Sequence, residues 1–116
     1  MTKSKIAQAF SQGDFEKCFM YLTDTTIWNT PGEQLLTGKQ EIESFCKIVK
    51  AYFDSVTTNF QQINLIENTN CVAINGTAEF MRDGKRVSFV SSCDVYVFDT
   101  DNNMEGITSY CITDRS

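Results

Sequence analysis

The chain of 116 residues contains no histidine and a single proline, Pro31. Without histidine, neither a Ser-His-Asp triad nor a Cys-His pair can form. The usual imidazole general base and the commonest transition-metal ligand are missing as well. Any acid/base chemistry in this protein therefore depends on carboxylates, tyrosines, lysines or cysteines.

Long apolar runs and clusters of basic residues are also missing. No stretch of about 18 apolar residues is present, so no segment is expected to span a membrane, and residues 1–10 lack the apolar core of a signal peptide. The net charge is −5 and the isoelectric point is about 4.6. An acidic chain without a lysine or arginine cluster is a poor partner for nucleic acid or for anionic lipid. We therefore expect a cytoplasmic protein that binds neither nucleic acid nor membranes.

The sequence offers no recognisable site for a metal or a cofactor. The five cysteines are an odd number, widely spaced and without a C-x-x-C pair, which is typical of reduced thiols rather than of disulfides or a zinc site. The acidic segment 99–103 lacks the glycine and the terminal glutamate of a calcium loop, so we interpret it as a turn. A glycine-rich phosphate loop is absent from the sequence. We expect no metal and no cofactor.

Helical patterns fill the first half of the chain. Residues 3–12 show helical spacing of apolar residues, a second helix follows Asp14, and a third begins at a capping box formed by Thr37 and Gln40. A short extended segment, residues 25–28, precedes the turn at Pro31-Gly32.

Strand patterns fill the rest of the chain. They begin at Phe60 and continue over residues 71–81, 87–98 and 104–113, with Asp83-Gly84 as the signal for a hairpin. Helices followed by strands predict one α+β domain over residues 1–116, with the helices on one face of an antiparallel sheet.

Several motifs, in this order, resemble the NTF2-like superfamily and particularly its SnoaL-like branch. They are Gly13-Asp14 before the second helix, Ile27-Trp28 before Pro31-Gly32, Gly38 to Ile42 at the third helix, and residues 93–96 in the long strand. The resemblance implies a cone-shaped, strongly curved antiparallel sheet wrapped around the N-terminal helices, with an apolar pocket inside. It also implies frequent homodimers through the outer sheet face. Family members include both enzymes and non-catalytic binders, so the fold alone does not determine function.

A comparison with ketosteroid isomerase, a member of this superfamily, argues against the same reaction. That enzyme uses an aspartate base and an oxyanion site made of a tyrosine and a protonated aspartate. When the sequences are aligned at Gly13-Asp14 and Pro31, the base falls on Thr30 and the tyrosine on Ile6. Only the oxyanion aspartate is retained, as Asp94. The chain is therefore not expected to be a ketosteroid isomerase.

Asp94 is the candidate catalytic residue. It lies within an apolar strand pattern and shares a strand face with Tyr96 and Phe98. On a concave face, burial would raise its pKa and suit it to donate a hydrogen bond or to act as an acid or base. The alternative is a structural role, with Asp94 facing solvent or bound to Ser92.

Further ligand-binding candidates lie around Asp94. Trp28 is expected to line the pocket or to belong to the core, and Asn29 and Thr30 to supply hydrogen bonds at its mouth. Ser109 and Cys111 are expected to face inward beside Asp94. Together with Tyr96 and Phe98, these residues make up the predicted site.

The sequence supports two main hypotheses. The first is a homodimeric domain that binds a small apolar molecule in its cone, with or without isomerase-, cyclase- or lyase-type chemistry at Asp94. The second is a non-catalytic module for protein interaction or dimerisation. A cavity of roughly 300 Å³ or more with convergent polar groups favours a ligand, whereas a filled cone favours the second hypothesis.

Overall fold

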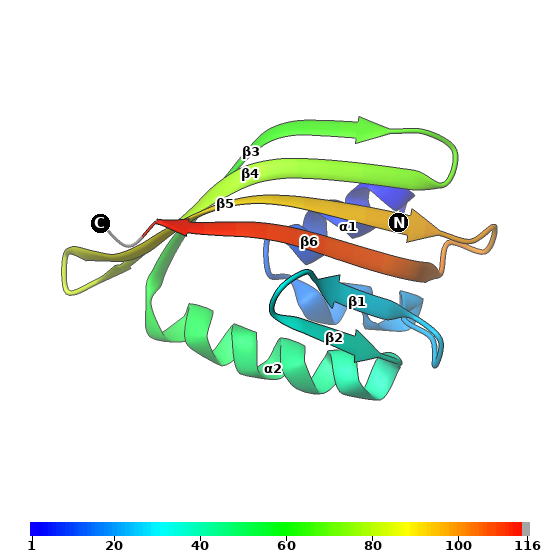
Figure 1. The fold of residues 1–116 in the computed structure, drawn as a ribbon, viewed down its shortest axis with the longest axis horizontal. Helices are drawn as coiled ribbons and strands as arrows, with labels where there is room; N and C mark the ends of the chain where they lie inside the picture. The colour runs from blue at the N-terminus through cyan, green and yellow to red at the C-terminus, as the bar shows by residue number, and fades with distance from the viewer. Residues whose placement is uncertain (115–116) are drawn as a thin grey trace.

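The computed structural model describes residues 1–114 and contains helices followed by a large sheet (Figure 1). The helices are α1 (Lys3–Ser11), the 3-10 helix η1 (Phe15–Tyr21) and α2 (Lys39–Ser55). The strands are β1 (Ile27–Thr30), β2 (Gln34–Thr37), β3 (Thr57–Glu67), β4 (Cys71–Arg82), β5 (Lys85–Phe98) and β6 (Met104–Asp114). This order confirms the predicted α+β class.

The six strands form one open sheet in the order β2-β1-β6-β5-β4-β3. All neighbours are antiparallel except β1 and β6, which are parallel, with Trp28 opposite Ile107. The prediction of a purely antiparallel sheet is wrong at this pair. Between β1 and β6 the chain passes through α2 and three long strands, which is connection enough for β6 to run in the direction of β1. Strand β2 is a further element that the sequence pattern did not indicate.

Irregularities in the long strands allow the sheet to curve around the helices. Register shifts interrupt the β3–β4, β4–β5 and β5–β6 ladders, and such bulges bend and twist a strand. Asp83 and Gly84 both have positive φ in the β4–β5 hairpin, as a type I′ turn requires. Figure 1 shows the sheet arching over α1 and α2, with α2 beneath the β1–β2 hairpin. The predicted cone-shaped arrangement is confirmed.

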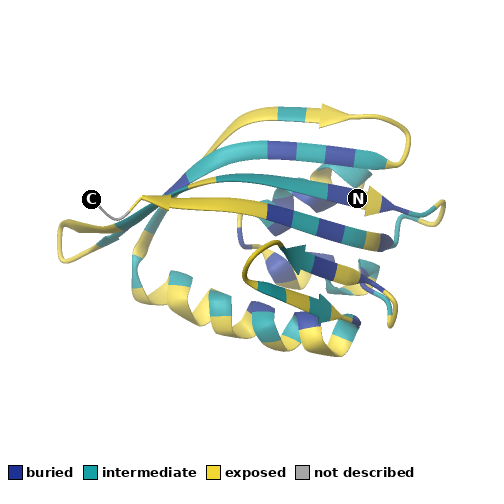
Figure 2. Ribbon diagram, viewed as in Figure 1, coloured by how far each residue is buried: buried dark blue, intermediate teal, exposed yellow. Residues whose placement is uncertain are grey.

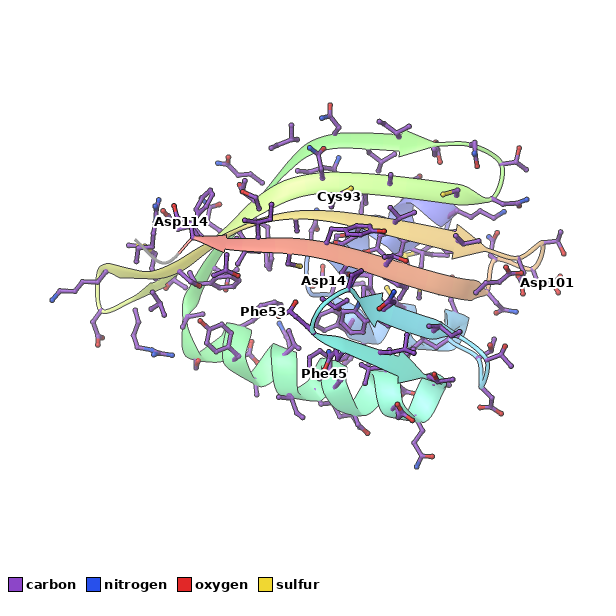
Figure 3. The ribbon with its side chains drawn as sticks, in the orientation of Figure 1. Asp14, Phe45, Phe53, Cys93, Asp101 and Asp114 are labelled. Atoms are coloured by element: carbon purple, nitrogen blue, oxygen red, sulfur yellow. The ribbon has the colours of Figure 1, made fainter. Side chains whose placement is uncertain are left out.

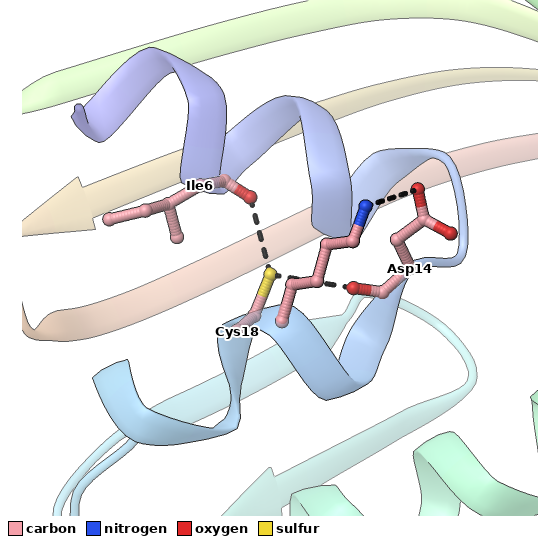
Figure 4. Close-up of polar contacts among 4 residues, drawn as sticks. Ile6, Asp14 and Cys18 are labelled. Atoms are coloured by element: carbon pink, nitrogen blue, oxygen red, sulfur yellow. Dashed lines mark hydrogen bonds and ion pairs between the residues drawn. The ribbon is translucent and has the colours of Figure 1, made fainter. Parts of the chain in front are cut away.

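Helix α1 ends at a sharp turn that brings η1 back against it. Gly13 has a φ of +85°, and a Cβ there would lie 2.9 Å from the Phe53 ring, so only glycine fits without a shift. Asp14 makes no capping hydrogen bond; its carboxylate pairs loosely with Lys17 at 3.9 Å. The buried Cys18 thiol donates to the Ile6 carbonyl at 3.4 Å (Figure 4). The predicted second helix is therefore present, but as a 3-10 helix.

The start of α2 differs from the predicted capping box. The N-cap is Gly38, with a φ of +90° and no side-chain cap. The Glu41 carboxylate instead accepts from the Thr37 backbone N–H at 3.2 Å. A glycine with positive φ at the N-cap leaves Thr37 inside β2, where it pairs with Ile27 and cannot cap the helix.

The core lies between the inner face of the sheet and the three helices, and the outer face is far more exposed (Figure 2). Tyr96, Phe98, Met104 and Ile107 are at most 2 % exposed on the inner face. These large side chains fill one end of the cone, the space between the inner sheet face and the helices. The other end holds the candidate site.

Candidate functional site

A cavity of about 340 Å³ occupies the open end of the cone. Its walls are largely aromatic, with rings from α1, η1, α2 and the strands: Phe10, Phe15, Phe45, Phe53, Phe60 and Phe80. Phe45 and Phe53 point from α2 toward the sheet (Figure 3). The cone is therefore not filled by its aromatic side chains.

The aromatic rings hold one another in place around the cavity. Phe53 stacks on Phe80 with ring centroids 5.6 Å apart. The Trp28 ring meets Phe10 edge-on at 4.9 Å and Phe45 at 5.5 Å. Such pairs add to the energy of apolar burial and fix ring orientation. The result is a preformed apolar wall on which a flat, uncharged molecule can lie.

Polar groups converge on one side of this wall. Ser92 and Asp94 come from β5, Ser109 from β6 and Ser11 from the last turn of α1. Asp94 and Ser109 are direct partners across the β5–β6 ladder, so their side chains share the inner face. An acid and three hydroxyl groups thus face an otherwise aromatic space.

Two chains of hydrogen bonds end at the Asp94 carboxyl group. The Ser11 hydroxyl donates to Asp94 Oδ2 at 2.8 Å and lies 2.5 Å from the Tyr96 hydroxyl. Because Ser11 has a single hydroxyl proton, Tyr96 donates to Ser11. On the other side, Trp28 Nε1 donates to Ser109 Oγ at 3.0 Å, and Ser109 bonds Asp94. The carboxyl is therefore oriented by two donor relays.

The electrostatics of Asp94 result from two opposed effects. Burial raises its pKa above the ordinary value because charge is disfavoured away from water, while the hydrogen bonds from Ser109 and Ser11 and the nearby Tyr96 hydroxyl lower it. Burial has the larger effect, so the net shift is upward. Burial and the neighbouring Asp94 charge raise the pKa of the Tyr96 phenol far above its usual range. Tyr96 therefore serves as a neutral donor, and Asp94 holds a proton more tightly than a surface aspartate does.

The structure brings five of the predicted site residues together at the cavity: Trp28, Thr30, Asp94, Ser109 and Cys111. Tyr96 and Phe98 share their face of β5 but lie deeper, in the closed end of the core. Tyr96 reaches the site only through its hydroxyl and Ser11.

Asn29 lies elsewhere, and its predicted place at the cavity mouth is a correction. It borders a shallow depression on the outer sheet face with Ile27 and Val97. Because side chains alternate along a strand, the inward position of Trp28 and Thr30 requires Asn29 to point outward.

Ser11 is the site residue that sequence reasoning missed. Its position after Phe10, at the end of a helical stripe, suggested only a helix end. Its partners Asp94 and Tyr96 are 83 and 85 residues away, so no local pattern signals the contact. The only local indication that Ser11 belongs to the site was that its hydroxyl lies next to the apolar stripe of α1.

The mouth of the cavity carries a charged and a thiol group. Glu33, from the turn between β1 and β2, lines the cavity beside Thr30 and Gln34. Burial, with the charges of Asp94 and Glu33, raises the pKa of Cys111 to about 11, so this thiol stays protonated. An acidic mouth favours neutral ligands over anions.

Within residues 1–114, no group of three or more histidine, cysteine, aspartate or glutamate side chains is placed to hold a metal ion. None of the described helices is long and apolar enough to cross a membrane.

Comparison with known proteins identifies the family. The structure superimposes with a TM-score of 0.83 on an NTF2-like protein of unknown function from Cytophaga hutchinsonii. The two are 35% identical, over 93% of this chain and 94% of that one. The chain belongs to the NTF2-like family. No protein-family model and no curated protein sequence matches it.

More distant structures share the fold of this NTF2-like domain. One is a SnoaL-like protein from Shewanella denitrificans, with a TM-score of 0.73 and 12% identity over 95% of this chain and 90% of that one. Another is an LEH-like epoxide hydrolase from M. tuberculosis, with a TM-score of 0.70 and 16% identity over 95% and 82%. At these identities the likeness concerns the fold and agrees with the SnoaL-like resemblance of the sequence.

Proposed function

We propose that this NTF2-like domain binds a small, uncharged, apolar molecule in its cone and that Asp94 acts on that molecule as a proton acceptor and donor. One observation carries the proposal. Asp94, with a raised pKa, lies on the wall of a 340 Å³ aromatic cavity and is held there by two donor relays. This volume lies in the range of small-molecule sites, about 300–1,000 Å³.

The chemistry that fits is proton transfer within one bound molecule. The hydroxyl groups of Ser11 and Ser109 both bond the carboxyl, which suits the ionised Asp94 to accept a proton from the ligand. The protonated carboxyl can then return the proton to another atom of the same molecule, so that no co-reactant is consumed. Isomerase-, cyclase- and lyase-type reactions use such a step. Trp28 and the phenylalanines would orient the ligand by stacking.

The binding half of the proposal is tested with a neutral fluorescent probe, N-phenyl-1-naphthylamine. We expect its emission to rise on binding and that of Trp28, the single tryptophan, to fall through energy transfer. Val49→Phe, which reaches into the cavity from α2, should weaken binding at least tenfold. Ile48→Phe, one position away on the exposed side of the helix, should not. Equal affinities for both variants and the parent chain would place the probe outside the cone.

A second function, dimerisation, is favoured by the outer sheet face. Exposed apolar side chains interrupt the expected polar pattern there: Ile27, Leu35, Val97, Tyr110 and Ile112. Leu35 is 61% and Ile112 75% exposed. We infer that a second copy of this chain covers this face, since burying it would remove apolar surface from water.

Sedimentation at micromolar concentration tests the dimer. The expected species has twice the 13.2 kDa mass of the chain, and Ile112→Lys should convert it to the monomer. Thr57→Lys, an exposed position at the start of β3, is the matched control. A parent protein that sediments only at 13.2 kDa contradicts the dimer and leaves the ligand proposal untouched.

A cytoplasmic location is also part of the proposal. The cysteines are all free thiols in the structure, including Cys111, which lines the cavity on one side and is open to solvent on the other. Such a set is typical of a reducing compartment. Thiol titration of the unfolded, freshly purified protein without reductant should count five free groups; fewer would indicate oxidation in the cell.

A further inference from the structure

A second, smaller cavity reaches Asp94. It measures about 50 Å³ and shares Ser11, Phe60, Ala78, Ser92 and Asp94 with the wall of the cone. Its remaining boundary includes Gln12 at the end of α1 and Gln61 and Gln62 of β3. We call it the rear cavity.

Both cavities lie under the inner face of the sheet, and their unshared linings extend toward opposite edges of it. Thr30, Glu33 and Gln34, at the mouth of the cone, belong to the β1–β2 hairpin. The rear cavity is bounded by exposed glutamines of β3. In the strand order, β2 and β3 are the two edges, and β5, which carries Asp94, lies between them. A ligand that fills the cone from the hairpin side therefore leaves the rear side of Asp94 uncovered.

The size and polarity of the rear cavity suit water. A cavity of a few tens of Å³ holds one or two water molecules, each of which needs about two to four polar partners. The cavity lining includes Ser11, Ser92, Gln12 and Gln62, whose hydroxyl and amide groups are of the kind that bonds water. The Gln62 side chain is itself held by a hydrogen bond from Gln8 Nε2 to its Oε1 at 3.2 Å. An aromatic ligand would not fit this space.

We propose that the rear cavity is a built water site and that its water carries protons between Asp94 and solvent while the cone is occupied. In this step the protonated Asp94 gives its proton to the rear water, which passes a proton to bulk water past the glutamines. The reverse transfers reload the carboxyl. The water site itself is independent of any ligand, whereas its use as a proton route rests on the proposed function.

Water–protein nuclear Overhauser spectroscopy on the ligand-free, methyl-labelled chain tests the site. Ile74 lines the rear cavity and not the cone, and Ile42 is fully buried away from both. We expect cross-peaks from long-lived water to the Ile74 methyl groups and none to those of Ile42. Absence of a water cross-peak at Ile74 would overturn the proposal.

Two glutamine variants separate the water site from the structure around it. Gln62→Met removes a polar partner of the water and the hydrogen bond to Gln8, and should weaken the Ile74 cross-peak at least twofold. Gln8→Met removes the same hydrogen bond but no residue of the cavity wall, and should leave the cross-peak in place. An equal loss in both variants would mean that α1–β3 packing, rather than the cavity lining, holds the water.

Saturation with N-phenyl-1-naphthylamine tests whether the proton route through the rear cavity is separate from the cone. The Ile74 cross-peak should persist when the probe fills the cone; its loss would show that both cavities share one access and would overturn the proton route. If the probe does not bind, the proposed function fails, but the ligand-free experiment still decides the water site.

Discussion

The two ends of the inner sheet face are built from the same strands but differ in the side chains that they carry. At the closed end, Tyr96 and Phe98 of β5 meet Met104 and Ile107 of β6, and all are nearly inaccessible to water. At the open end, the same two strands carry serines, Asp94 and Cys111. The change from large apolar to small polar side chains along one face creates the cavity. Tight apolar packing and the candidate site thus lie at different ends of the same strands.

The closed end should respond most strongly to loss of side-chain volume. Phe98→Ala removes a ring that is 2 % exposed, and a cost of about 3–5 kcal/mol in unfolding free energy is expected. Phe60→Ala, at the wall of the open cavity, should cost clearly less because that ring has space on one side. Urea denaturation measures both. Equal losses would mean that the open end is packed as tightly as the closed end.

Ser11 joins the two ends, because it bonds both Tyr96 and Asp94. Ser11→Ala leaves the buried Tyr96 hydroxyl without its partner, which should cost about 1–3 kcal/mol of stability. Adding Tyr96→Phe removes the orphaned hydroxyl and should recover part of this loss. A double variant with stability no better than Ser11→Ala would show that the hydroxyl is satisfied in some other way.

The pH dependence of stability should distinguish Asp94 from an ordinary carboxylate. Because its pKa is raised by folding, the native state holds the proton more tightly than the unfolded chain. Stability from this group is complete below the unfolded pKa and is lost as pH rises through the folded pKa. Each pH unit in that window changes stability by at most about 1.4 kcal/mol.

Asp94→Asn provides the comparison, since an amide does not titrate. The variant should gain stability relative to the parent chain as pH rises from about 4 through the folded pKa, as measured by urea denaturation at each pH. If parent and variant show parallel pH curves, Asp94 is solvated and the raised pKa is wrong. Catalytic turnover, once a substrate is known, should be lost in the same variant.

Local patterns predicted what depends on local periodicity. Strand alternation predicts a common face for Asp94, Tyr96 and Phe98, and the structure has all three on the inner face. The same rule, applied within β1, would have shown that Asn29 cannot accompany Trp28 inward. Strand β2 was not predicted because its adjacent residues Leu35 and Leu36 do not alternate with polar residues.

Contacts between residues that are far apart in the chain could not be predicted from the sequence. The Ser11 contact depends on how the end of α1 lies against β5, and the cavity depends on the curvature that the three register shifts allow. Neither follows from periodicity. The sequence indicated Asp94 as the central group, whereas its hydrogen-bond partners and the second cavity beside it required the three-dimensional arrangement.

The most direct test of the account is carbon-13 NMR of the Asp94 carboxyl group, titrated with acid in the presence and absence of N-phenyl-1-naphthylamine. We expect a pKa above the ordinary value of 3.8 and a carboxyl resonance that moves when the probe binds. A carboxyl that titrates at the ordinary value and does not respond to bound probe would contradict the placement of Asp94 in a ligand-binding cone.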